Sequence, residues 1–81
     1  MRSARIPHFE RSFRKLPLRI RKAFEKQHEL LLKDIRHPSL RAKKYDESAG
    51  VWQARVTNNV RFYFTIEEDI YYLIDIEKHK D

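Results

Sequence analysis

The chain contains no cysteine and only one glycine among its 81 residues. Without cysteine, neither a disulfide framework nor a cysteine-based zinc site can reinforce the fold, and we expect a reducing, cytoplasmic setting. The longest apolar run, residues 70–74, is far too short to cross a membrane. No apolar stretch follows the arginine-rich first residues, so we expect neither a signal peptide nor a membrane partner.

Positive charge is what the chain has in excess, and it is unevenly distributed. The net charge is +6. Residues 1–44 contain fourteen Lys/Arg and four Asp/Glu, whereas residues 45–81 contain four and eight. Such an excess favours a polyanion such as RNA, or an acidic protein segment. The same composition also fits a solvated basic helix that has no partner.

The first half of the chain has the periodicity of helices. Apolar residues recur at helical spacing over residues 9–16 and again, after Pro17, over residues 20–35. Pro17 fits the first turn of the second helix, and Pro38 ends it. Residues 5–8 are a candidate first strand, which their proline would confine to a sheet edge. We therefore expect two N-terminal helices.

From residue 51 the pattern changes to the alternation of β-strands. Residues 51–56, 60–66 and 70–76 are rich in β-branched and aromatic residues, with short polar turns between them. Strands joined this tightly form an antiparallel meander. The predicted fold class is α+β: one domain, residues 1–81, in which two N-terminal helices (a helical hairpin) pack on one face of a small twisted antiparallel sheet.

The register of the first hairpin decides which side chains face solvent. A three-residue loop collects the apolar residues of both strands on one face, whereas a two-residue turn mixes charged and aromatic residues, so we expect the first. It makes Arg55 and Arg61 direct neighbours on the solvent side, flanked by Gln53 and Tyr63. Opposed like charges are destabilising and call for an anion, and arginine is preferred for bidentate phosphate binding. The predicted pairs are Val56 with Val60, Ala54 with Phe62, and Trp52 with Phe64, with Ile66 on the same apolar face.

The second hairpin offers a plainer interpretation of the same arginines. The same logic places Asp75 beside Arg61, so that the site would be an ordinary surface salt bridge, which is common and weak. A single carboxylate still leaves one guanidinium free for a phosphate. The predicted pairs are Phe64 with Tyr72 and Phe62 with Ile74, with Glu77 and His79 continuing on the solvent face.

Four segments together resemble a known toxin family. They are FRKLP (13–17), HPSLRAKKY (37–45), VWQARVTNNVRFYF (51–64) and YLIDIEKH (72–79). The ordered set is similar to the RelE/ParE toxin superfamily, and the spacing from Trp52 through Arg55 and Arg61 to His79 is most like its RelE and YoeB branches. The resemblance implies the fold described above and the toxin of a type II toxin–antitoxin system. It also implies an mRNA interferase, an endoribonuclease that cuts messenger RNA on the ribosome without a cofactor and is restrained by a cognate antitoxin.

The resemblance also assigns roles to residues. Arg61 corresponds to the arginine on the scissile phosphate, Arg55 to a second basic position, and His79 to an acid/base position. Histidine suits that role because it titrates nearest to neutral pH. The four histidines of the chain show no metal-ligand spacing, so we expect no metal site. The expected RNA-binding residues are Lys43, Lys44, Gln53, Tyr63, Lys78 and Lys80.

Two features of the family pattern are missing. Lys80 and Asp81 stand where many members have a tyrosine, and no residue matches the glutamate base of some members. Two alternatives therefore stay open: a ParE-like toxin that inhibits DNA gyrase by protein contact, and a catalytically weak homologue that acts only as a binding module. At the residue level, His79 can also be a frayed end of the chain, and the lysine pair a solvated loop.

Overall fold

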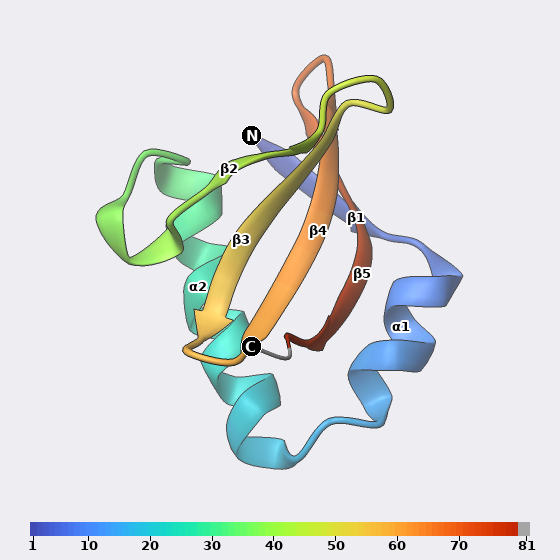
Figure 1. Ribbon diagram of the computed structural model, residues 1–81, viewed down its shortest axis with the longest axis vertical. Helices are drawn as coiled ribbons and strands as arrows, with labels where there is room; N and C mark the ends of the chain where they lie inside the picture. The colour runs from blue at the N-terminus through green and yellow to red at the C-terminus, as the bar shows by residue number, and fades with distance from the viewer. Residues whose placement is uncertain (80–81) are drawn as a thin grey trace.

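A five-stranded sheet forms the body of the molecule, with two helices against it (Figure 1). The computed structural model describes residues 1–79. Its strands lie in the order β1-β5-β4-β3-β2, and neighbours run antiparallel except β1, which is parallel to β5. The predicted α+β fold is confirmed. In chain order the elements are β1 (Arg2–Arg5), α1 (Pro7–Arg14), α2 (Leu18–Lys33), the 3-10 helix η1 (Pro38–Leu40), β2 (Lys43–Asp46), β3 (Val51–Thr57), β4 (Val60–Glu67) and β5 (Ile70–Lys78).

The N-terminal part and one edge of the sheet differ from the prediction. The first strand is Arg2–Arg5 rather than residues 5–8, because Pro7 begins α1, where its missing N–H costs nothing. Strand β2 was not predicted, since all its residues are exposed and no alternation marks it. The two helices follow one another as predicted, but α1 packs on β5 and α2 on β3. Neither helix within residues 1–79 combines the length and apolar character needed to span a bilayer.

Phe24 lies at the centre of the core and joins its parts. Its side chain is fully buried. Its ring centroid lies 5.3 Å from that of Phe9, 5.4 Å from that of Phe13 and 5.1 Å from that of Phe62. These contacts hold α2 against both α1 and β4.

The predicted pairing of β3 with β4 is confirmed along most of its length, but the turn differs. The turn has two residues, and a bulge at Val56 restores the expected register beyond it. The bulge lets both Val56 and Val60 face the core, although they are not paired as predicted. Ile66, expected on the apolar face, is 36% exposed. The pairs that agree with the prediction are Arg55 with Arg61, Ala54 with Phe62, and Trp52 with Phe64.

Strands β4 and β5 pair antiparallel as predicted, but the predicted register between them is wrong. A bulge at Ile74 shifts the register between the two ends of the hairpin. Leu73 and Ile76 are three residues apart and both are buried, which regular alternation does not allow, and the bulge turns both toward the core. Phe62 opposes Ile76 instead of Ile74, Phe64 opposes Leu73 instead of Tyr72, and Glu77 instead of Asp75 opposes Arg61.

A small polar cluster ties β1 to α2. Ser3 Oγ and His28 Nε2 are hydrogen-bonded at 2.7 Å, and Arg5 forms an ion pair with Glu25 at 2.6 Å. The His28 ring also stacks on Phe24. Burial, with the nearby Arg5 guanidinium, lowers the pKa of His28, while two glutamates of α2 act in the opposite direction. The folded chain therefore favours neutral His28.

This cluster makes stability depend on pH. Unfolded, His28 takes up a proton near its ordinary pKa of 6.5, whereas the folded chain takes it up only at lower pH. The stability that neutral His28 contributes is complete above pH 6.5, and it is lost as the pH falls from 6.5 toward the lower pKa of the folded chain. We expect the urea midpoint to fall between pH 7 and pH 5, and to fall less in His28→Gln, which keeps a hydrogen-bonding side chain. An equal fall in both proteins would assign the pH dependence to other groups.

Candidate functional site

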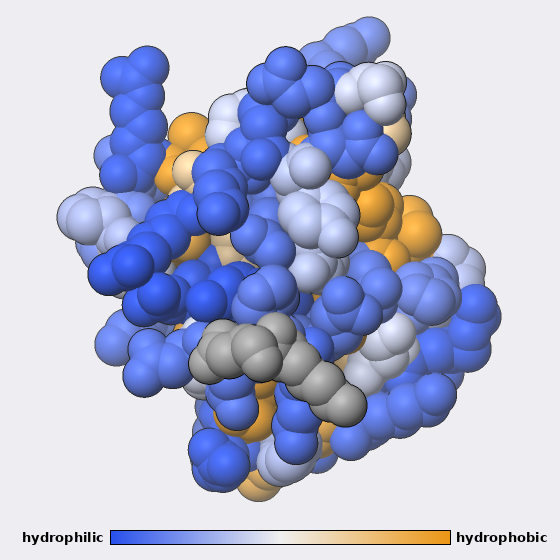
Figure 2. Space-filling model, viewed as in Figure 1, coloured by the Kyte–Doolittle hydropathy of each residue, from blue (hydrophilic) through white to orange (hydrophobic). Residues whose placement is uncertain are grey.

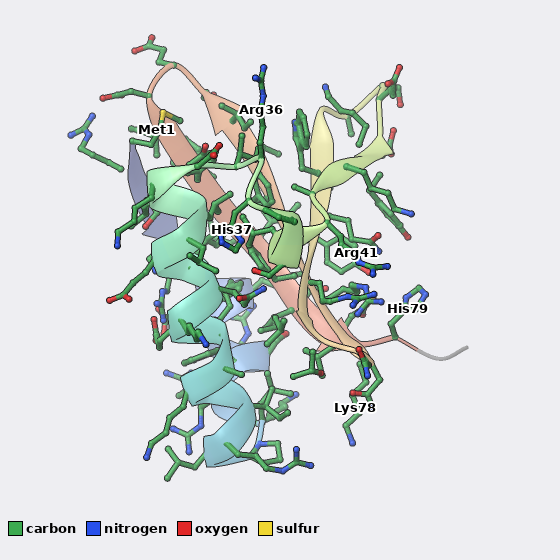
Figure 3. All side chains as sticks on the ribbon, turned by 90° about the vertical axis from the view of Figure 1, so that its left-hand side faces the viewer. Met1, Arg36, His37, Arg41, Lys78 and His79 are labelled. Atoms are coloured by element: carbon green, nitrogen blue, oxygen red, sulfur yellow. The ribbon has the colours of Figure 1, made fainter. Side chains whose placement is uncertain are left out.

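The face of the sheet turned away from α2 carries mostly hydrophilic side chains (Figure 2). A cavity of about 340 Å³, here called the basic cavity, opens on this side. Within residues 1–79, four permanent cations and one histidine meet in it, and no carboxylate lines it. Figure 3 shows two of its residues, Arg41 and His79, on the side of the sheet opposite α2. The lining residues are Arg41, Lys43, Gln53, Arg55, Arg61 and His79.

Arg61 is fixed by the turn between β3 and β4. Its Nη1 donates hydrogen bonds to the carbonyl oxygens of Thr57, at 2.7 Å, and Val60, at 3.2 Å. Both hydrogens of this nitrogen are therefore used. In the described part of the chain, Nε and Nη2 have no hydrogen-bond partner, and Glu77 on the opposite strand forms no ion pair with Arg61. The remaining fork is free for a bidentate contact with an anion.

Arg55 has a buried nitrogen with nothing to bind. Its Nε is shielded from solvent and has no acceptor within residues 1–79. Burial, together with the like charges of Arg41 and Arg61, lowers the pKa of Arg55, which remains a cation at neutral pH. A buried donor without an acceptor is unfavourable. An anion in the basic cavity would offset the repulsion among the three guanidinium groups.

Arg41 joins the site although the sequence analysis did not select it. It follows η1 and has a φ of 47°, in the left-handed region. That conformation costs about 1–2 kcal/mol for a residue with a side chain. The available signal was the basic run of residues 41–44, from which only Lys43 and Lys44 were selected. The position of Arg41 depends on η1, the 3-10 turn that precedes it.

His79 is held in place by its backbone. Strand β5 ends at Lys78, and the backbone N–H of His79 donates to the carbonyl oxygen of Asn59 at 2.7 Å. The exposed side chain then lines the basic cavity. The same turn therefore anchors two site residues, Arg61 through the carbonyl of Thr57 and His79 through that of Asn59.

Comparison at the level of sequence finds no matching family model and no similar curated protein. Solved structures do match. A YoeB/ParE toxin from Agrobacterium tumefaciens has a TM-score of 0.79 at 13% identity, over 99% of this chain and 100% of that one. A chain of the archaeal RelE–RelB complex from Pyrococcus horikoshii has a TM-score of 0.78 at 11% identity, over 95% and 92%. A chain of the toxin–antitoxin complex RelBE2 from Mycobacterium tuberculosis has a TM-score of 0.77 at 20% identity, over 98% and 96%. The chain has the RelE/ParE toxin fold.

Within this RelE/ParE fold, strand alternation separates the two lysines selected from the sequence. Lys43 opposes Gln53 and faces the basic cavity, whereas Lys44 opposes Trp52 on the other side of β2. The Nζ of Lys44 lies 5.2 Å from the centre of the Trp52 ring, a cation–π contact. Lys44 therefore lies outside the basic cavity.

Tyr63 also lies outside the basic cavity. Its side chain is buried, and its ring meets that of Tyr45 edge-on at 5.0 Å. Its hydroxyl accepts a hydrogen bond from Gln53 Nε2 at 3.3 Å, and burial raises its pKa. Tyr63 therefore holds the side chain of Gln53 from the neighbouring strand, β4. Lys78 is exposed and does not line the cavity, and Lys80 lies outside the described residues.

Asp75 does not neutralise Arg61. The bulge in β5 moves it opposite Tyr63, where its Oδ1 lies 3.2 Å from His8 Nε2 and accepts the backbone N–H of Ile76 at 2.8 Å. The salt-bridge interpretation of the arginine pair is therefore wrong. Within residues 1–79, no ion pair involves Arg55 or Arg61.

Proposed function

We propose that this chain is the toxin of a toxin–antitoxin pair and that it cleaves messenger RNA on the ribosome. The observation that carries the proposal is the basic cavity, where Arg55 and the free fork of Arg61 lie with His79 and no carboxylate of residues 1–79 lines the wall. A phosphodiester supplies acceptor oxygens for the fork of Arg61 and a negative charge for Arg55. The RelE/ParE fold supports the proposal, because solved proteins with this fold include toxins named YoeB/ParE and RelE.

The proposed reaction is a metal-independent transesterification. The ribose 2′-oxygen loses its proton and bonds to the adjacent phosphorus, and the bond from phosphorus to the 5′-oxygen breaks. The products are a 2′,3′-cyclic phosphate and a 5′-hydroxyl. Arg61 and Arg55 stabilise the charge on the phosphoryl oxygens, and His79 carries one of the two proton transfers.

An antitoxin is the expected protein partner. Two of the matching structures are complexes, RelE–RelB and RelBE2. An antitoxin segment that reaches the basic cavity of this chain would place acidic side chains against Arg41, Lys43 and the arginine pair. The cations would then be neutralised and the RNA excluded.

The decisive experiment maps messenger ends. Purified protein is added to a cell-free translation reaction on a defined messenger, and new 5′ ends are located by primer extension, with and without EDTA. We expect cuts within translated codons in both conditions. A parallel assay follows DNA supercoiling by gyrase, which we expect to be unaffected. Intact messenger with inhibited gyrase would replace the proposal by a ParE-like activity, and no effect on either would leave a binding module.

Arg41 offers a test in which binding and stability separate. Arg41→Gly removes a cation from the basic cavity but relieves about 1–2 kcal/mol of backbone strain, against about 0.5–1 kcal/mol of added chain entropy in the unfolded state. We expect an unchanged or slightly higher melting temperature together with about tenfold weaker binding of single-stranded RNA, measured by fluorescence anisotropy. Unchanged RNA binding would exclude Arg41 from the site.

A further inference from the structure

A second cavity lies directly beside the basic cavity. Its volume is about 480 Å³, and it lies where η1, α2 and the end of β3 meet. Arg41 and Arg55 line both cavities, so the two cavities adjoin at these side chains. Among the described residues no carboxylate lines the second cavity. The other polar lining residues are Gln27, Ser39, Thr57 and Asn58.

Gln27 holds the wall of the second cavity in place. Its side chain is 8% exposed, and its Nε2 donates to the carbonyl oxygens of Ser39, at 3.1 Å, and Arg55, at 3.0 Å. The first bond fixes the 3-10 turn that precedes Arg41, and the second fixes β3 at Arg55. The separation of the two shared arginines is therefore set by a buried side chain of α2.

The shared arginines have more donors than one phosphate can use. An arginine presents five N–H groups and no acceptor, and Arg41 and Arg55 each line both cavities. Asn58 is exposed at the rim of the second cavity and adds a neutral amide. A continuous polyanion could therefore contact both cavities through the same two guanidinium groups.

We propose that the second cavity binds the neighbouring phosphate of the same RNA strand, so that the chain grips two consecutive phosphates across Arg41 and Arg55. The inference rests on the proposed function, because it takes single-stranded RNA as the occupant of the basic cavity. A dinucleotide, which has one internucleotide phosphate, fills only the basic cavity. A longer strand gains the second contact.

Two neighbouring asparagines of the β3–β4 turn allow a matched test. Asn58 lines the second cavity and Asn59 lines neither cavity. Asn58→Asp and Asn59→Asp change the net charge equally, and the carboxylate of the second variant can still accept the hydrogen bond that Thr57 donates to Asn59 Oδ1. The melting temperatures of both variants are measured first, to establish that the turn is intact.

Binding is then measured for a dinucleotide and a hexanucleotide, both with 2′-O-methyl riboses so that they are not cleaved. We expect wild-type protein to bind the hexanucleotide more tightly, and Asn58→Asp to weaken that binding about tenfold while leaving the dinucleotide within about twofold. Asn59→Asp should change neither by more than about twofold. Equal effects of the two variants on the hexanucleotide would overturn the inference.

The remaining outcomes are also decisive. If Asn58→Asp spares RNA but weakens binding of a poly-glutamate peptide, the occupant of the second cavity is a protein segment and the inference is wrong. If wild-type protein binds neither oligonucleotide, the inference fails, while the proposed function is decided separately by the mapping of messenger ends on ribosomes. If wild-type protein binds the dinucleotide and the hexanucleotide with equal affinity, the basic cavity binds RNA but the second cavity binds no further phosphate, and the inference is wrong.

Discussion

Replacing Arg61 with alanine is expected to lower the rate of messenger cleavage by at least about 10²-fold. Arg61 lines the cavity, and its fork of Nε and Nη2 is free while Nη1 is held by the carbonyls of Thr57 and Val60. Loss of one donor aimed at developing negative charge in a transition state costs about 10²–10³ in rate. The measurement is the single-turnover rate of cleavage on programmed ribosomes.

Two controls separate chemistry from folding. Arg61→Lys keeps the charge but loses the planar fork, so we expect an intermediate rate. Arg14→Ala removes an exposed arginine from the last turn of α1, away from the cavity, and should leave the rate unchanged. Because Arg61 also binds the turn, the melting temperature of each variant is compared with the assay temperature. A normal rate in folded Arg61→Ala would remove this residue from the mechanism.

The arginine pair could be predicted because it depends on alternation along one hairpin. Burying the apolar side chains of β3 and β4 on one face places Arg55 opposite Arg61. The bulge at Val56 compensates for the shorter turn, so the wrong loop length did not change the predicted pairing of Arg55 with Arg61. Local pattern and global burial agree in this hairpin.

The remainder of the site depends on contacts that no local pattern contains. Ile74 bulges because both Leu73 and Ile76 must be buried, and whether they are depends on how the helices cover β5. Arg41 follows a turn that Gln27, on α2, binds at the carbonyl of Ser39. Each of these contacts links residues distant in the chain, so the opposed partner of Arg61 and the role of Arg41 could not be predicted from the sequence.

Replacing Phe24 with alanine is expected to cost about 3–5 kcal/mol of unfolding free energy, the usual range for a buried phenylalanine. A domain of this length has a total stability of roughly 4–12 kcal/mol, so the variant should be largely unfolded or melt at a much lower temperature. Phe13→Ala is the matched control, because Phe13 belongs to the same cluster but is only half-buried. We expect about half the loss, measured by urea unfolding.

The same variant tests how the core supports the site. Phe24 precedes Gln27 by three residues on α2, and Gln27 Nε2 holds the carbonyl of Arg55 at 3.0 Å. The ring of Phe24 packs α2 against Phe62 of β4, and Gln27 then binds the backbone of Arg55 on β3, so we expect a change at position 24 to move Arg55. In Phe24→Leu, which should remain folded, we expect RNA binding to weaken although no residue of the basic cavity has changed. If that variant loses stability but binds RNA as tightly as wild type, the cavity is built by the sheet alone and α2 contributes nothing to it.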